Sequence, residues 1–411
     1  MIAGNNAERS PYDQLFYLFV IGAGVVVTCS RRINWKRVFA ANPALVTFYA
    51  YFAVSILWSG DPSGSMKRLF KDFGQLFVIA ILWSEKQPLE VIRSLYIRCA
   101  SVLFPLSIVC DRYFPRIGKA YTLEGEPMFT GVTMQKNTLG EMVMSLGLII
   151  IWDLIESHKA GLTLRKLWDR YLLLMMGLFL LRDSQSKTAL LCLLLGAVLT
   201  LRRGRLASRW VSNAALVTAL ILPYIVIFAQ QYRSLIAPVV EAVGRNMTFT
   251  GRTDIWQHIT THTVNPLIGA GYWNFWGGPG GRAIMVAMNT TVPNAHCGYL
   301  DMYLDGGFIS LMLLGILLIT VSRNLIRKST ASQFYSLRFA ILVVAIIYNM
   351  SETTFARLTT SWFTLLLALT EFSSATAAAN GTFSINTDQD LAGNLTSLPT
   401  TRAASPGEWF S

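Results

Sequence analysis

The stretch "FISLMLLGILLITV", Phe308–Val321, is apolar along its length except for a serine, a glycine and a threonine. A helix that crosses a bilayer needs roughly 20 mostly apolar residues, because lipid offers no hydrogen bonds and only a helix satisfies its own backbone. Comparable runs occur at Tyr171–Leu181, Ala189–Leu201 and Ala214–Ala229. The stretch therefore predicts a membrane helix, and its repetition predicts several.

The composition agrees with this interpretation. The 411 residues are 53% apolar and only 14% charged, whereas a soluble chain carries about 25% charged residues. We predict an all-α polytopic membrane protein with about eleven transmembrane helices. The predicted spans are Leu15–Cys29, Pro43–Trp58, Phe70–Trp83, Leu95–Cys110, Leu139–Ile155, Tyr171–Leu181, Thr188–Leu201, Trp210–Gln230, Tyr299–Val321, Phe339–Met350 and Thr360–Phe372.

Basic residues gather in alternate loops, and this pattern sets the orientation of a membrane protein. The four basic loops contain Arg31, Arg32, Lys36 and Arg37; Lys159, Arg165, Lys166 and Arg170; Arg202, Arg203, Arg205 and Arg209; and Arg323, Arg327, Lys328 and Arg338. We expect all four loops in the cytoplasm. The net charge of +12 then reflects topology and attraction to anionic lipid. No basic soluble domain is evident, so a nucleic-acid-binding protein is disfavoured.

The chain divides into three predicted parts. A short N-terminal segment, 1–14, precedes a membrane domain, 15–372, and a tail, 373–411, rich in Ser, Thr, Ala, Asn and Gly. That composition predicts a disordered cytoplasmic tail. The longest outer loop is 231–298. Connections longer than about 15 residues are usually functional or disordered, and the seven aromatic residues of this loop and an amphipathic pattern at Thr253–Val264 favour function.

The outer loop is basic, which the cytoplasmic charge rule does not explain. It carries four arginines against two acidic residues; the arginines are Arg233, Arg245, Arg252 and Arg282. Arginine forms bidentate hydrogen bonds with phosphate oxygens. Two interpretations remain open: a site for an anionic substrate such as a lipid pyrophosphate, or pairing with lipid headgroups and the two acids.

The histidines suggest acid–base chemistry more than metal binding. His258 and His262 share a helix face, but the metalloprotease pattern needs a glutamate between them, and none is present. We therefore predict no metal site. His296 lies at the outer boundary of the ninth span, where a neutral imidazole can take a proton from a hydroxyl group. A helix-capping role is the alternative. Lys136 and Lys187 lie at outer ends of spans, where lysines commonly extend to headgroups.

Four stretches occur in order: "MQKNTLGEMVMSLGL", "DSQSKTALL", "GRTDIW" with "NPLIGAGYWNFW", and "NAHCGYLDMYLDGGFISLMLLG". Together they resemble the bacterial O-antigen ligase/polymerase superfamily, especially its exopolysaccharide-polymerase branch, over about residues 136–314. "SETTF", Ser351–Phe355, adds to the match. The resemblance implies a glycosyltransferase C-type bundle of about twelve helices, one more than the spans above, with a large periplasmic loop.

The resemblance also implies an activity. Members transfer a glycan from an undecaprenyl-pyrophosphate carrier to an acceptor sugar hydroxyl, on a growing glycan or a lipid core, at the periplasmic face of the bacterial inner membrane. It implies a metal-independent inverting glycosyltransferase without a cofactor. Membrane lipids and the proteins of polysaccharide chain-length control and export are expected partners, and nucleic acid is not.

Residue roles follow from the matched motifs. Arg252 would grip the donor pyrophosphate, Lys187 would be a second phosphate contact, and His296 would be the general base. Lys187 replaces an arginine common in the family, so a point charge replaces a bidentate grip. Cys297 stands where asparagine is common.

Further candidates for substrate binding are Lys136, from the first of the matched stretches, and the tryptophans Trp256 and Trp273. Asp305 stands where glutamate is often found in the family, and no role is assigned to it. Trp256 and Trp273 could stack on sugar rings or belong to an interfacial aromatic belt. A transporter or flippase for a lipid-linked anionic glycan is the alternative function. Transporters place ionisable residues near the bilayer midplane, whereas these residues cluster at outer helix ends.

Overall fold

The computed structural model describes residues 11–121, 125–201, 252–261, 264–289, 292–328 and 332–372. Within them the chain is almost entirely α-helical, and the polytopic all-α prediction is confirmed. The predicted span Trp210–Gln230, the predicted disordered tail 373–411 and the start of the large loop lie outside the described residues.

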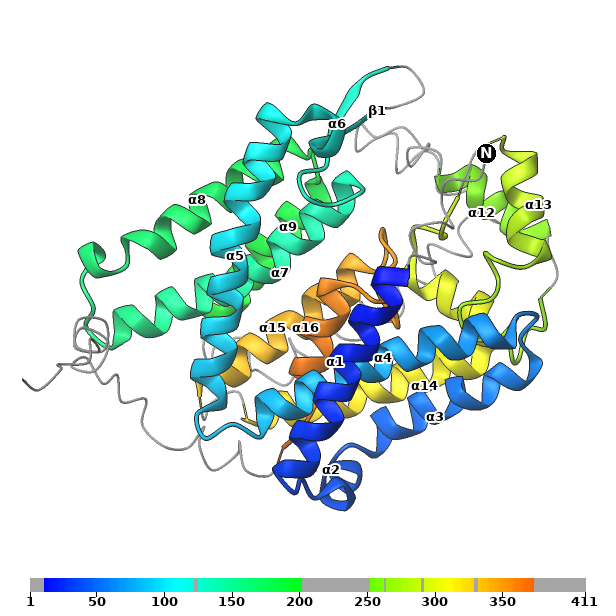
Figure 1. Ribbon diagram of the computed structural model, residues 1–411, viewed down its shortest axis with the longest axis horizontal. Helices are drawn as coiled ribbons and strands as arrows, with labels where there is room; N and C mark the ends of the chain where they lie inside the picture. Colours follow the sequence, from blue (N-terminus) through cyan, green and yellow to red (C-terminus); the bar gives the residue numbers. More distant parts are fainter. Residues whose placement is uncertain are drawn as a thin grey trace, which may run out of the picture. The chain divides into compact units, whose positions relative to one another are not determined.

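Within the described ranges, most successive helices are joined by short connections (Figure 1). Their bounds are α1 Pro11–Ser30, α2 Trp35–Ala41, α3 Pro43–Ser55, α4 Pro62–Trp83, α5 Pro88–Tyr113, α6 Pro115–Gly118, α7 Lys136–Lys159, α8 Trp168–Asp183, α9 Lys187–Leu201, α12 Arg252–Thr261, α13 Pro279–Ala287, α14 Gly298–Lys328, α15 Gln333–Tyr348 and α16 Thr360–Leu369. Short 3₁₀ segments are η3, Ile56–Trp58, and η4, Leu164–Lys166. Strands β1, Lys119–Tyr121, and β2, Pro127–Phe129, form an antiparallel hairpin.

Each predicted span within the described residues falls on a helix. Three helices, α5, α7 and α14, are individually long and apolar enough to cross a membrane, and α1 with α2 would make a fourth if this pair, bent by 106°, is one span. The other apolar helices are shorter, among them α9, α15 and α16. The total of eleven or twelve spans therefore stays a prediction. The amphipathic pattern at 253–264 is confirmed as a helix over Arg252–Thr261.

Helix starts follow local chemistry. Proline occupies a first-turn position of α3, α4, α5 and α13, where its missing N–H costs no hydrogen bond. Asp61 caps α4, because its Oδ1 accepts from the backbone N–H of Gly64 at 2.9 Å. These signals set where the interhelical loops end and the helices begin.

Helix α7 lies at the centre of the helical core. Residues 139–150 are buried without interruption, and α5, α8, α9, α15 and α16 all pack against it. A helix that is apolar on every face is expected in the core of a bundle. Each end of α7 is tied to α15. The hydroxyl of Tyr348 donates to the carbonyl of Asn137 at 3.2 Å, and Lys159 Nζ donates to Gln333 Oε1 at 2.7 Å.

Helix α14 is broken at Gly307, which has a φ of 62°. A Cβ there would lie 2.2 Å from the carbonyl of Leu267, so the close approach requires glycine. The backbone N–H groups of Phe308 and Ile309 donate to Pro266 and Leu267 at 2.8 and 3.1 Å. The break therefore docks the "NPLIGAG" part of the large loop directly onto the helix that follows His296.

Candidate functional site

Arg252 and His296 meet at one carboxylate, Glu352. Arg252 Nη2 donates to Glu352 Oε1 at 2.6 Å, and His296 Nδ1 lies 3.6 Å from Glu352 Oε2. The three side chains are 16%, 25% and 12% exposed, in the order Arg252, His296, Glu352. They are therefore mostly desolvated and still reachable. We call these three residues the Arg–His–Glu cluster.

Glu352 lies in the loop between α15 and α16. Hydrogen bonds to the backbone of this loop hold it in place. Asn349 Oδ1 accepts from the N–H groups of Thr354 and Phe355 at 2.9 and 3.0 Å. The N–H of Gly298 donates to the carbonyls of Asn349 and Glu352. This anchorage fixes Glu352 against the start of α14, directly after His296.

His296 is held in an unusual conformation. Its φ is 48°, in the left-handed region that non-glycine residues seldom occupy, and its N–H donates to Asn294 Oδ1 at 3.0 Å. The preceding carbonyl, of Ala295, accepts from Trp256 Nε1 at 2.8 Å. Strained residues persist where the surroundings over-determine them, often at functional sites. Trp256 and Asn294 together aim the imidazole at Glu352.

One nitrogen of the His296 imidazole, Nδ1, faces the carboxylate of Glu352. Nδ1 of His296 is buried without a hydrogen-bond partner among the described residues, at a distance from Glu352 that a small side-chain rotation would close. A histidine whose Nδ1–H donates to a carboxylate presents Nε2 as the basic nitrogen. With Nδ1 turned toward the acid, Nε2 is the nitrogen of His296 that is left to accept a proton.

The two predicted lysines lie at helix starts beside the same loop. Ser351 Oγ donates to Thr188 Oγ1 at 3.3 Å, which places the start of α9, and so Lys187, next to Glu352. The Tyr348–Asn137 bond places Lys136, the first residue of α7, at the same end of α15. Neither ammonium group forms an ion pair with another described residue. The predicted cations thus converge from three helices, α7, α9 and α12.

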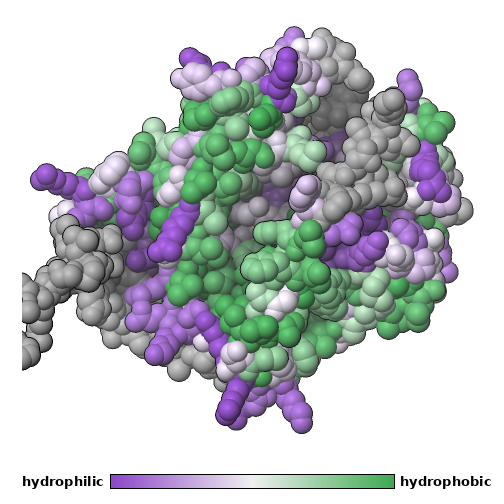
Figure 2. Space-filling model, in the orientation of Figure 1, coloured by the Kyte–Doolittle hydropathy of each residue, from purple (hydrophilic) through white to green (hydrophobic). Residues whose placement is uncertain are grey.

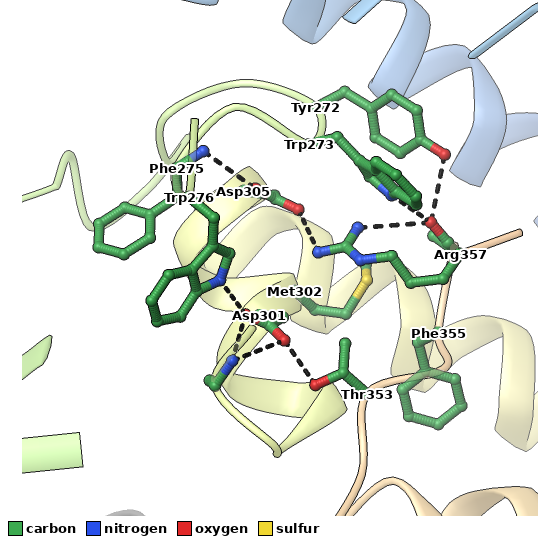
Figure 3. A network of polar contacts seen from close by, with 12 residues as sticks. Tyr272, Trp273, Phe275, Trp276, Asp301, Met302, Asp305, Thr353, Phe355 and Arg357 are labelled. Atoms are coloured by element: carbon green, nitrogen blue, oxygen red, sulfur yellow. Dashed lines mark hydrogen bonds and ion pairs between the residues drawn. The ribbon is translucent and has the colours of Figure 1, made fainter. Parts of the chain in front are cut away.

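A second network of polar contacts holds the loop that carries Glu352 (Figure 3). Asp301, 1% exposed, accepts from Trp276 Nε1 at 2.6 Å, from Thr353 Oγ1 at 2.5 Å and from the N–H of Ala295. This aspartate therefore ties the residue before His296 to the residue after Glu352. All of these partners are groups of the protein, so Asp301 positions these two segments.

Arg357 completes this network. Its Nη2 donates to Asp305 Oδ2 at 2.7 Å, and its guanidinium lies 4.7 Å from the ring centroid of Trp273. Burial lowers the pKa of Arg357, but the carboxylates of Asp305 and Asp301 outweigh burial, and the net pKa is raised. Arg357 therefore remains a cation that is neutralised by Asp305.

The two predicted tryptophans are engaged with protein groups. Trp256 is 5% exposed, and its indole N–H is used by Ala295. Trp273 is half-buried, donates to the carbonyl of Ala356 at 2.6 Å, and contacts the guanidinium groups of Arg68 and Arg357. Both rings are in contact with other groups of the protein, and this favours structural roles over stacking on sugars.

Sequence reasoning missed Glu352, Asp301 and Arg357. Glu352 and Asp301 lie in the matched stretches "SETTF" and "NAHCGYLD", but no role was assigned to them there. All three are also ionisable groups in or next to short outer connections of an apolar chain. Arg233, Arg245 and His262 lie outside the described residues. Within the residues that are described, no group of three or more His, Cys, Asp and Glu side chains has the arrangement of a metal site, and metal independence stays a prediction.

The fold and the site define a multi-pass helical membrane protein whose ionisable site is assembled from two loops and two helix starts. A family model described as O-antigen ligase matches residues 171–315, a range that contains Lys187, Arg252 and His296. The chain is also 24% identical over 306 residues to the exopolysaccharide production protein ExoQ of Rhizobium meliloti (strain 1021), covering 70% of this chain and 67% of that protein.

These two matches confirm the resemblance to the O-antigen ligase/polymerase superfamily. They support a role in glycan ligation or polymerisation during polysaccharide biosynthesis.

Proposed function

We propose that the chain transfers a glycan from an undecaprenyl-pyrophosphate carrier to an acceptor sugar hydroxyl at the periplasmic face of the inner membrane. The observation that carries this proposal is the Arg–His–Glu cluster, flanked by Lys136 and Lys187. It combines cations for a diphosphate with a base for an alcohol. The ExoQ relative, a protein of exopolysaccharide production, favours polymerisation of a repeat unit as the particular outcome.

The charges suit a diphosphate leaving group. Arg252 donates one hydrogen bond to Glu352. Because a guanidinium has five N–H donors, others remain for phosphate oxygens. Lys136 and Lys187 add two cations that no described acid neutralises. As the bond between the anomeric carbon and the phosphate oxygen breaks, negative charge grows on that oxygen, and preorganised cations stabilise it.

The proton has a defined path. The acceptor hydroxyl forms the new bond to the anomeric carbon and gives its proton to Nε2 of His296, while Glu352 stabilises the resulting imidazolium. The carrier leaves as its pyrophosphate. Attack from the face opposite the leaving group inverts the anomeric configuration. No step in this scheme requires a metal.

The test is a transfer assay with the purified full-length protein in proteoliposomes and a lipid-linked glycan. His296→Ala should lower kcat by roughly 10²–10⁴-fold, the usual contribution of one acid–base group. Glu352→Gln should lower kcat and kcat/KM together, as expected when a transition-state interaction is lost. Lys187→Gln should also lower kcat and kcat/KM, because its ammonium is proposed to stabilise the charge that grows on the leaving oxygen.

The matched control is Arg282→Ala. Arg282 belongs to the same loop but is exposed and donates to the carbonyl of Gly277, so its loss should leave transfer within about twofold of the parent. Full transfer by correctly folded His296→Ala or Arg252→Ala would remove the proposed residue roles.

The transporter alternative is favoured by one observation, the buried acids within helices. Glu141 and Asp72 are 5% and 1% exposed, and intramembrane acids often mark transport paths. Each is held by protein donors, however: Glu141 by the N–H of Ser361 at 2.7 Å, and Asp72 by Gln75 and Tyr272. Flipping of a labelled lipid-linked glycan without any glycan transfer would favour the transporter.

A further inference from the structure

An apolar cavity runs along α3 from Asn42, beside α2, to Ala53. It has a volume of about 380 Å³ and is bordered by α2, α3, α4 and the residues after α16, with Trp35, Phe39, Tyr49, Ala50, Phe77 and Phe372 among its lining residues. Ligand pockets typically begin near 300 Å³. The cavity is therefore large enough to hold part of a ligand.

The residues that line the cavity suit a hydrocarbon chain as ligand. Its polar side chains are already satisfied: Asn42 bonds to the backbone of Val38 and Glu371, and Thr370 Oγ1 donates to the carbonyl of Leu366. An apolar cavity whose polar groups are satisfied stays dry and accepts apolar ligands. An acyl chain fits this surface, and a sugar does not.

Only the α2 end of the cavity is remote from the large loop. Asn42, Leu45 and Val46 line that end, and the cavity continues along α3 as far as Ala53. Ser55, at the last turn of α3, accepts from the N–H of Tyr272 in the large loop. The 13 residues of α3 place the α2 end about 20 Å from Ser55 at 1.5 Å per residue, so a headgroup bound at the α2 end is distinct from the group that reacts at the cluster.

Helix α2, which lines one end of the cavity, also carries exposed cations. Lys36 and Arg37 lie between Trp35 and Val38, both of which line the cavity, and both cations are exposed. Arg31 is committed to Glu85 at 2.6 Å, but Lys36, Arg37 and Arg32 form no ion pair with another described residue. Figure 2 shows hydrophilic side chains projecting at the lower edge, where Figure 1 places α2, next to a hydrophobic surface.

The nearby acid does not cancel this charge. Glu371 lies between two lining residues, Thr370 and Phe372, but its carboxylate is paired with Lys328 at 3.1 Å and with Arg338 at 3.2 Å. The α2 end of the cavity therefore keeps positive charge that no described acid neutralises. That charge is complementary to a phosphate-bearing headgroup.

We propose that this cavity is a binding site for an anionic phospholipid, with one acyl chain between α2, α3 and α4 and the phosphate on Lys36, Arg37 and Arg32. The basic loops lie on this side, so the lipid belongs to the leaflet opposite the Arg–His–Glu cluster. The lipid is a structural ligand that stabilises the 106° bend between α1 and α2. It is not a glycan donor.

The test is lipid binding to the purified full-length protein by native mass spectrometry, with no glycan donor present. The probes are dioleoylphosphatidylglycerol and dioleoylphosphatidylcholine, which share acyl chains and differ in charge. The parent should bind the anionic lipid more tightly. Lys36→Gln with Arg37→Gln should weaken anionic-lipid binding roughly 30-fold, since each basic residue near the surface contributes about a fivefold factor, and should leave the zwitterionic lipid unchanged.

The matched control is Arg165→Gln with Lys166→Gln, which removes the same charge from the exposed segment η4 on another basic loop. It should leave both affinities unchanged. Ala50→Trp, which fills the cavity from an exposed position, should weaken binding of both lipids. Equal binding of the two lipids by the parent, or equal losses in the two charge variants, would overturn the proposal. Either result leaves the transferase assay unaffected.

Discussion

At the scale of residues, the site depends on one acid serving two partners. Glu352 holds the Arg252 guanidinium at 2.6 Å and faces His296 Nδ1. In a partly buried site such pairing limits the cost of desolvating each charge. Removing Glu352 would leave Arg252 without its partner and His296 without an orienting group. The motif residues are therefore one cooperative unit and should not contribute additively.

The cysteine that follows His296 is predicted to be chemically inert. Cys297 is 1% exposed, and burial raises the pKa of its thiol to about 12. The thiolate is the reactive form, and at pH 8 a pKa of about 12 leaves roughly one thiol in ten thousand ionised. N-ethylmaleimide at pH 8 should label exposed Cys29 and spare Cys297 until the protein is denatured, as measured by mass spectrometry of peptides. Equal labelling of both in the native protein would contradict this account.

At the scale of elements, α14 connects every part of the site. Its first residue, Gly298, donates to the loop that carries Glu352, its first turns carry Asp301 and Asp305, and its break at Gly307 receives the "NPLIGAG" segment. A glycine-permitted break of this kind lets irregular backbone be buried, because the loop satisfies the hydrogen bonds that the helix gives up. The helix thus serves as the scaffold for the large loop and for the loop that carries Glu352.

Two glycines of α14 make a matched pair. A Cβ on Gly298 would lie 2.1 Å from Asn349 Oδ1, whereas a Cβ on Gly315 meets nothing within 4 Å. Gly298→Ala should displace Asn349, break its bonds to the Glu352 loop and destabilise the protein by about 2 kcal/mol. Gly315→Ala should be neutral or stabilise it by up to about 1 kcal/mol. Thermal unfolding in detergent measures both, and similar effects at the two sites would show that the Asn349 anchor is unimportant.

At the scale of the molecule, the ends of α7 separate two faces. Its 24 residues extend about 36 Å, enough to cross a hydrocarbon core of about 30 Å. One end is bonded to Tyr348, four residues before Glu352, and the other to Gln333 beside the basic connection. The candidate site and the predicted cytoplasmic loops therefore lie at opposite ends of the bundle.

Reporter fusions test this orientation. Alkaline phosphatase fused after Thr163, in the basic loop that follows α7, should be inactive, because the enzyme folds only outside the cytoplasm. The same reporter fused after Asn289, in the large loop, should be active. A cytoplasmic fluorescent reporter at each site should give the reverse pattern. An inactive phosphatase at Asn289 would place the site in the cytoplasm and end the case for an extracytoplasmic glycan donor.

The sequence by itself determined the fold class, predicted the orientation and identified Arg252, His296 and Lys187 as candidates. These follow from apolar run length, loop charge and short motifs, all of which are local. Only the tertiary structure decided that Glu352 joins Arg252 to His296, that Trp256 supports the backbone beside His296, and that α2 borders an apolar cavity. Glu352 and Arg252 are 100 residues apart, and no local pattern specifies which distant side chains a bundle brings into contact, because that depends on how its helices pack.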